Sequence, residues 1–197
     1  MLQRWPGLLT PPLIQRWLAR LDDHPAGSLK LSQVLDLEEV LQALRALRAE
    51  LPVRPRVLVG QCWVRRAQPP HHWHQDGALH HDFIARPGGV PLPMWTVWIP
   101  LTPCGVDAPG LAWVQPSLDH LLAPAELSHD RVLARFGAAR IESPPLAAGE
   151  GLLFDGGLLH RSHVHPAMTK RRTSVELRFI GDVLPAALAG EPLRDWV

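Results

Sequence analysis

The stretch GLLFDGGLLHRS, residues 151–162, contains the signals from which the fold can be worked out. Its first five residues form a short apolar run of the kind that makes a buried strand. Gly156 and Gly157 then mark a turn, after which the chain continues to His160. The pattern predicts an apolar strand that ends at a tight turn and is followed by a histidine.

Other segments resemble this first strand in being short, rich in β-branched and aromatic residues, and bounded by proline or glycine. They lie at residues 56–66, 93–101, 110–116, 139–143 and 171–183. The 21 prolines among 197 residues also favour many short elements joined by turns. Strands at this spacing predict a sandwich or barrel rather than a parallel sheet with crossover helices.

The first fifty residues have a helical pattern instead. Thr10 followed by two prolines is a helix start signal, and apolar residues then recur at helical spacing as far as Leu21. A second helix is predicted to begin at Asp36, with Glu39 as its capping-box partner, and to end before Pro52. One further helix is predicted near 124–136.

These patterns predict a mainly β protein with N-terminal helices, in which the β part is a jelly roll. The length fits a single domain, 1–197, with a helical N-terminal part at 1–52, a jelly-roll core at 53–183 and a C-terminal tail at 184–197.

Composition excludes several classes of function. The formal net charge of +1 gives no reason to expect a nucleic acid or an anionic membrane as partner. No apolar run approaches the ~18–20 residues of a membrane span, and the N-terminus lacks a secretory signal, so a cytoplasmic location is expected. Two cysteines make neither a disulfide framework nor a CxxC metal motif.

The stretch PPHHWHQDGALHHD, residues 69–82, contains a candidate pair of metal ligands. On an extended strand residues i and i+2 share a face, so His74 and Asp76 can offer a nitrogen and an oxygen to one ion. His160 is the best candidate for a third ligand. Two histidines and one carboxylate on one side of an ion form the facial triad of non-haem Fe(II) oxygenases, which leaves positions open for a co-substrate and dioxygen.

A 2-oxo dicarboxylate co-substrate would also need a cation for its distal carboxylate. Arg171 stands eleven residues after His160 and opens the segment RRTSVELRF. By strand alternation Arg171 shares the apolar, inward face of that segment, whereas Arg172 falls on the face with Ser174, Glu176 and Arg178. Arg171 is therefore the predicted carboxylate-binding residue, and Arg172 is expected to lie in solvent.

Four segments together resemble the phytanoyl-CoA dioxygenase (PhyH-like) group of Fe(II)/2-oxoglutarate-dependent dioxygenases. They are WHQDG, VWIPLTPCGVDAPGLAWVQPSLDH, AGEGLLFDGGLLHRS and KRRTSVELRF, and their order and spacing match over about residues 56–182. The resemblance implies a cupin-like double-stranded β-helix with iron bound by His74, Asp76 and His160. It also implies that 2-oxoglutarate chelates the iron and forms a salt bridge with Arg171.

The same resemblance implies three further contacts to the co-substrate. Ser162 should help to hold a carboxylate of 2-oxoglutarate, and Trp98 should line its pocket. Gln61, on the preceding strand, is a looser candidate for a polar contact in the pocket.

The remaining histidines of this region are interpreted as neighbours of the site rather than ligands. His72 and His74 form the HxH pair of a cupin metal site, but the glutamate expected about four residues later is missing. Adjacent residues such as His81 and Asp82 would face opposite sides of a strand. His71, His72, His80 and His81 are therefore placed at the rim, and His163 and His165 in a surface loop.

The resulting hypothesis is a hydroxylase that oxidises an unactivated C–H bond of a small molecule with dioxygen and releases succinate and CO2. The alternatives are a jelly-roll domain that binds metal or ligand without oxygenase activity, and a cupin-type enzyme that uses His72 as a ligand. The substrate and the oligomeric state do not follow from the sequence.

Overall fold

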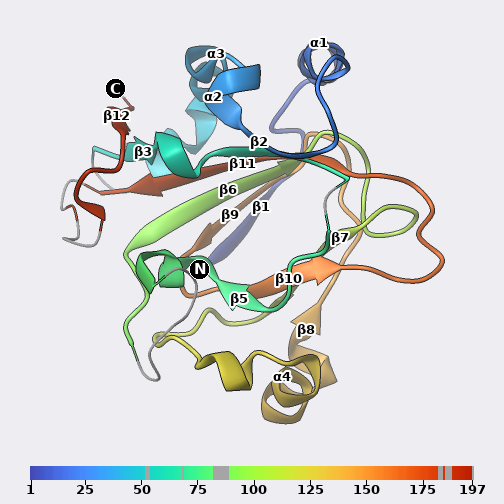
Figure 1. The fold of residues 1–197 in the computed structure, drawn as a ribbon, viewed down its shortest axis with the longest axis vertical. Helices are drawn as coiled ribbons and strands as arrows, with labels where there is room; N and C mark the ends of the chain where they lie inside the picture. The colour runs from blue at the N-terminus through green and yellow to red at the C-terminus, as the bar shows by residue number, and fades with distance from the viewer. Residues whose placement is uncertain (52–53, 68, 82–88, 182–183, 185–187, 197) are drawn as a thin grey trace.

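The computed structural model describes residues 1–51, 54–67, 69–81, 89–181, 184 and 188–196. Asp82 lies outside these residues, and the side chains of His80 and His81 are also not described. Two antiparallel sheets face each other, with helices on the outer side of each (Figure 1). The fold is a jelly roll, or double-stranded β-helix, so the predicted fold class is confirmed.

The larger sheet has eight strands. Its main path runs, in spatial order, through β1 (Leu2–Trp5), β9 (Gly151–Asp155), β6 (Met94–Pro100), β11 (Thr173–Ile180), β3 (Arg56–Leu58) and β12 (Leu193–Asp195). Off this path, β4 (Trp63–Arg66) pairs with both β11 and β2 (Gly27–Lys30). The central strand β11 therefore has neighbours on both edges.

The smaller sheet has four strands. In spatial order they are β5 (His74–Gln75), β10 (Leu159–His163), β7 (Gly110–Val114) and β8 (Ile141–Glu142). The α-helices are α1 (Pro11–Leu21), α2 (Leu31–Val34), α3 (Leu37–Ala43) and α4 (His129–Phe136). Short 3-10 helices cover Arg45–Glu50, Val59–Gln61, Asp76–His81, Pro124–Glu126 and Ala138–Arg140.

The helical signals near the N-terminus are confirmed in α1 and α3. Asp36 caps α3, and its side chain accepts hydrogen bonds from the backbone N–H groups of Glu38 and Glu39 at 2.8 and 3.4 Å. The side chain of Glu39, however, pairs with Arg16 and Arg20 of α1 instead of closing a capping box.

The prediction that residues 1–52 are helical is incomplete, because two segments of this part are strands of the larger sheet. β1 pairs with β9 and β2 pairs with β4. The tail contributes β12, which pairs with β3. These edge strands are only four or three residues long, too short for a period-two pattern to stand out.

Alternation along the strands separates two apolar layers. Val175, Leu177 and Phe179 of β11 pack with the N-terminal helices against the outer face of the larger sheet. On the other face, Trp98 of β6 and Phe154 of β9 pack with residues of β7 between the two sheets. The inner face of β11 carries Ser174, Glu176 and Arg178 instead, all of them buried. The space between the sheets is thus apolar near β9 and charged near β11.

Two glycines allow the turns that flank the predicted metal ligands to touch. Gly77 donates a backbone hydrogen bond to the Gly156 carbonyl at 2.8 Å. A Cβ on Gly77 would lie 2.7 Å from that carbonyl oxygen, and one on Gly156 would lie 2.9 Å from the Gly77 Cα. Any larger residue would push the segment that carries Asp76 away from the turn before β10.

Candidate metal centre

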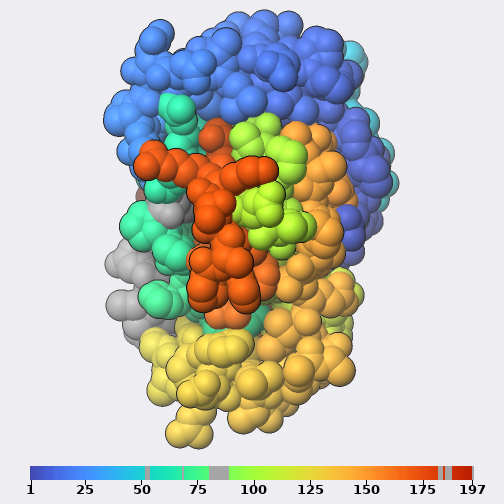
Figure 2. All heavy atoms as spheres, turned by 90° about the vertical axis from the view of Figure 1, so that its right-hand side faces the viewer, coloured from blue at the N-terminus to red at the C-terminus, as the bar shows by residue number. Residues whose placement is uncertain are grey.

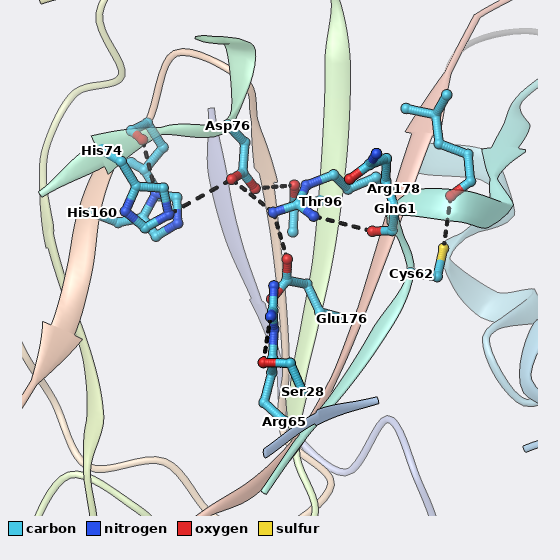
Figure 3. Close-up of polar contacts among 12 residues, drawn as sticks. Ser28, Gln61, Cys62, Arg65, His74, Asp76, Thr96, His160, Glu176 and Arg178 are labelled. Carbon is cyan, nitrogen blue, oxygen red and sulfur yellow. Dashed lines mark hydrogen bonds and ion pairs between the residues drawn. The ribbon is translucent and has the colours of Figure 1, made fainter. Parts of the chain in front are cut away.

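His74, Asp76 and His160 converge between the two sheets, as the sequence predicts. His74 and His160 are directly opposite each other in the pairing of β5 with β10. Asp76 begins the 3-10 helix that follows β5, so a tight turn, rather than strand alternation, brings it to the same side. One ligand atom from each residue lies within 4.8 Å of the others, and His74 Nε2 is 3.8 Å from Asp76 Oδ1 (Figure 3).

Both imidazoles are oriented by the backbone carbonyl two residues earlier in the chain. His74 Nδ1 lies 2.7 Å from the His72 carbonyl, and His160 Nδ1 lies 3.0 Å from the Leu158 carbonyl. A carbonyl can only accept, so in both rings Nδ1 carries the proton and Nε2 does not. This tautomer is the one in which a histidine ligates a metal through Nε2.

The electrostatics of the centre keep His74 and Asp76 in the ionisation states that a metal needs. Burial, with a further contribution from His160, lowers the pKa of His74 to about 3, so the ring is neutral. Burial would raise the pKa of Asp76, but Arg178, His160 and His74 outweigh it and hold that pKa below its ordinary value. Asp76 is therefore a carboxylate although only 1 % of its surface is exposed.

The centre forms one wall of a cavity between the sheets. Its other walls include Arg65, Trp98, Phe154, Ser162, Arg172 and Glu176. The free volume of this cavity is about 20 Å³. Ser162 and Trp98, both implied by the family resemblance, thus lie in the same cavity as the three candidate ligands. The Ser162 hydroxyl also accepts a hydrogen bond from the backbone N–H of His71 at 3.0 Å.

The prediction that Arg171 faces the inside and Arg172 the solvent is wrong. Arg172 lines the cavity, and Arg171 does not. Arg172 is 7 % exposed, its guanidinium lies 5.3 Å from the Trp98 ring, and it donates to the Gly110 carbonyl at 3.0 Å. Arg171 is exposed and lines two surface hollows instead. Both faces of β11 are buried, the apolar one against the helices and the polar one inside the jelly roll, so apolar character did not identify the cavity side.

Arg172 has an unusual set of partners for a buried cation. Its hydrogen bonds go to the backbone carbonyls of Pro109 and Gly110, and no described carboxylate lies within ion-pair distance of it. Burial lowers the pKa of its guanidinium, but an arginine stays protonated in proteins. A buried charge without a counter-ion is costly, so this position favours an anionic ligand in the cavity.

Gln61 does not reach the cavity with its side chain. Its amide donates to Glu191 at 3.3 Å, whereas its backbone carbonyl accepts a bond from Arg178 at 3.0 Å. The candidate polar contact of Gln61 with a co-substrate therefore has no support in this geometry. The residue contributes to the site through its main chain.

The other histidines lie around the centre. His71 is exposed and lines both the cavity and an outer hollow that also contains His72, Trp73 and Leu127. His72 is exposed, and among the described residues the only group of three or more potential ligands is His74, Asp76 and His160. The arrangement does not fit the cupin alternative, which needs His72 as a ligand.

Figure 2 faces the end of the molecule where β10 leads to β11. The connecting segment, which contains His165 and Arg171, lies on the surface between the N-terminal layer and the layer that contains α4. His165 is exposed and His163 partly buried. The predicted surface loop is correct for His165, whereas His163 is the last residue of β10 and pairs with Gly110 of β7.

Sequence reasoning missed the charged residues that surround Asp76. Arg178 Nη2 donates to Asp76 Oδ1 at 2.9 Å and forms an ion pair with Glu176 at 2.5 Å. Thr96 donates to Asp76 Oδ2 at 2.6 Å, and Arg65 lies 3.4 Å from Glu176 (Figure 3). The sequence signal that could have identified these residues is the polar side chain at every second position from Arg172 to Arg178. That pattern fits a solvent-exposed strand face as well as a buried polar one.

The low pKa of His74 predicts a pH dependence for the metal-free protein. The unfolded chain takes up a proton at this residue below about pH 6.5, whereas the folded state does so only near pH 3. Folding stability is therefore lost as pH falls through this window, by about 1–2 kcal/mol between pH 7 and pH 5 from this residue. Urea unfolding at both pH values measures it.

The matched control for this prediction is His165→Gln, an exposed histidine. His74→Gln should reduce the difference in unfolding free energy between pH 7 and pH 5, and His165→Gln should leave it nearly unchanged. An equal pH dependence in wild type and His74→Gln would contradict the assignment of a neutral, buried imidazole.

Fold and site together define a class: a jelly roll with a His–Asp–His cluster inside it. No protein-family model matches the sequence, and no curated protein matches it either. The PhyH-like resemblance therefore has no support at the level of a family. No helix among the described residues is long and apolar enough to cross a membrane.

Solved structures similar to this chain include one described as α-ketoglutarate-dependent and others solved with iron bound. The non-haem α-ketoglutarate-dependent epimerase SnoN from nogalamycin biosynthesis is 18% identical over 91% of this chain and 76% of its own, with a TM-score of 0.67. HygX from Streptomyces hygroscopicus, solved with iron bound, is 13% identical over 98% and 91% of the two chains, also at 0.67. EctD from S. alaskensis with bound Fe is 16% identical over 97% and 80%, at 0.65. At these identities the likeness establishes the fold.

Proposed function

We propose that the protein is an Fe(II)- and 2-oxoglutarate-dependent oxygenase that hydroxylates an unactivated C–H bond of a small molecule. His74, Asp76 and His160 would hold the iron, and the reaction would consume dioxygen and release succinate and CO2. The observation that carries the proposal is the convergence of two imidazoles and one buried carboxylate, with one ligand atom of each within 4.8 Å of the others, in a cavity that also contains Arg172.

The donor set fits Fe(II) in a non-haem oxygenase. Two neutral imidazoles and one carboxylate bind one side of a six-coordinate ion and leave three positions open. Both histidines are held in the ligating tautomer by carbonyl groups. His74 and Asp76 therefore need no change in protonation to accept a divalent metal.

The second part of the cavity fits the co-substrate. We infer that Arg172, in place of Arg171, binds the distal carboxylate of 2-oxoglutarate, since a guanidinium can pair with a carboxylate through two parallel hydrogen bonds. The Ser162 hydroxyl lies on the same cavity wall and can donate to a carboxylate, while Trp98 covers one face of the Arg172 guanidinium. Solved structures of EctD and HygX with 2-oxoglutarate bound support a dicarboxylate in this fold.

When bound, the iron and 2-oxoglutarate supply the oxidising power, and the protein supplies orientation and the exclusion of water. Phe154 packs edge-on against the His160 ring at 4.9 Å, and Leu111 and Trp98 line the same space. These apolar groups limit the access of water to the reacting centre. The carboxylate of Asp76 occupies a position that halogenases of related type leave open for chloride, which favours hydroxylation.

Enzymes with a similar fold are described as catalysing reactions other than hydroxylation. Two of the similar structures are described as an epimerase and a carbocyclase. Mass spectrometry of the product would separate these outcomes, because hydroxylation adds one oxygen atom, whereas an epimerisation leaves the mass unchanged.

The test is an anaerobic titration of the protein with Fe(II) and 2-oxoglutarate, followed by visible absorption. We expect a weak charge-transfer band with wild type, no band with His160→Ala, and a retained band with His72→Ala. A wild type without a band would contradict the proposal, and loss of the band in His72→Ala would restore the cupin-type alternative. A band without succinate formation under oxygen would favour a binding protein that lacks oxygenase activity.

A further inference from the structure

The carboxylate of Asp76 is held from the opposite sheet before any metal binds. Arg178 of β11 donates to Oδ1 at 2.9 Å, and Thr96 of β6 donates to Oδ2 at 2.6 Å. The two histidines come from the smaller sheet. The contacts of Arg178 and Thr96 with Asp76 therefore link the candidate metal centre to the larger sheet (Figure 3). Both oxygens of the carboxylate are thus engaged.

The Arg178 guanidinium is fixed as firmly as the carboxylate that it contacts. It is 3 % exposed, donates to the Gln61 carbonyl at 3.0 Å and pairs with Glu176 at 2.5 Å. Burial would lower the pKa of Arg178, but the carboxylates of Asp76 and Glu176 outweigh it and raise that pKa. Arg65 lies 3.4 Å from Glu176, so two acids and two bases alternate along the row. Such a row is nearly neutral and can stay buried.

We propose that Arg178 is a positioning residue that fixes the rotation of the Asp76 carboxylate and so makes it a ligand through Oδ1 alone. This inference rests on the proposed function. The terminal torsion of an aspartate is soft, so an unrestrained carboxylate could present either oxygen or both. With Thr96 on Oδ2 and Arg178 on one side of Oδ1, the remaining lone pair of Oδ1 lies toward His74 Nε2, 3.8 Å away.

Single-oxygen binding matters for the number of open metal positions. A carboxylate that binds through both oxygens occupies two positions, which would leave two instead of the three that a bidentate co-substrate and dioxygen need together. Arg178 thus keeps the third position open. A purely structural ion pair would make no such difference once the protein is folded.

The test uses Co(II) binding to the metal-free protein, measured by calorimetry and by visible absorption, without co-substrate or turnover. The central variant is Arg178→Met/Glu176→Gln, which removes one positive and one negative charge and so preserves the charge balance. We expect its Co(II) dissociation constant to rise about 10- to 100-fold, as for other groups that orient metal ligands. We also expect a changed visible spectrum, because the carboxylate is free to bind differently.

Two single variants keep the test decisive if the double variant does not fold. Arg178→Lys keeps the charge but loses the planar geometry, and Thr96→Val removes only the hydrogen bond to Oδ2. Each should change the Co(II) spectrum and raise the dissociation constant by several-fold. Arg171→Met is the matched control, because Arg171 is exposed and lies outside the cavity; it should bind Co(II) within about threefold of wild type.

The outcomes separate this inference from the proposed function. Folded variants of Arg178 and Thr96 that bind Co(II) with the wild-type affinity and spectrum would overturn the role of Arg178. A wild type that does not bind Co(II) would overturn the proposed function and this inference with it.

Discussion

Replacing Asp76 by alanine is expected to destabilise the metal-free protein by about 3–5 kcal/mol, because it leaves Arg178 buried with less than its full counter-charge. The residue is 1 % exposed and its Oδ1 accepts from Arg178 at 2.9 Å. In a metal site with several carboxylates, removing one of them ordinarily relieves the repulsion among them when the metal is absent. Here the same carboxylate also belongs to the ion pair that fills the interior of the jelly roll.

Chemical unfolding of the metal-free protein measures this effect, with Asp76→Asn as the matched variant. The amide keeps an acceptor for Arg178 but loses the charge, so its loss of stability should be smaller than that of Asp76→Ala. His160→Gln removes a candidate ligand without breaking an ion pair and should cost less than Asp76→Ala. If Asp76→Ala has the same free energy of unfolding as wild type, the ion pair between Asp76 and Arg178 does not stabilise the fold.

Arg172→Met should weaken the binding of 2-oxoglutarate at least about 30-fold, because it removes the charge that pairs with the distal carboxylate. Arg172 is buried, lines the cavity and, among the described residues, donates hydrogen bonds only to backbone carbonyls. Anaerobic titration of the Fe(II)-loaded protein with 2-oxoglutarate measures the dissociation constant.

The neighbouring arginine provides an internal control for this prediction. Arg171→Met removes the same charge one residue away, from a side chain that is exposed and lies outside the cavity. Its dissociation constant for 2-oxoglutarate should stay within about threefold of wild type. A large effect of Arg171→Met with little effect of Arg172→Met would reinstate the sequence-based choice.

The parts of the site that sequence reasoning located depend on short-range signals. His74 and Asp76 are two residues apart, so any compact local structure brings them close. His160 follows a strand and a glycine turn, and the structure places it opposite His74 in the pairing of β5 with β10. The jelly-roll class followed from many short apolar strands, although the two-residue strand β5 and the edge strands β1, β2 and β12 are too short to show a pattern.

The choice between Arg171 and Arg172 failed because it assumed that an apolar strand face points to the active site. In β11 the apolar face, with Val175 and Leu177, packs against the helices. The polar face, with Glu176 and Arg178, points into the jelly roll, where the charges pair with one another and with Asp76. Such pairing is a tertiary property and leaves no local trace in the sequence. For the same reason Thr96 and Arg178 were not identified as partners of Asp76.

The central claim, that His74, Asp76 and His160 bind one iron beside a 2-oxoglutarate held by Arg172, is tested most directly by anomalous diffraction at the iron edge. The crystals would be grown without oxygen in the presence of Fe(II) and 2-oxoglutarate. We predict a single anomalous peak at bonding distance from Nε2 of both histidines and from Oδ1 of Asp76. The distal carboxylate of 2-oxoglutarate should contact Arg172. The absence of a peak at these atoms, or a co-substrate bound away from Arg172, would contradict it.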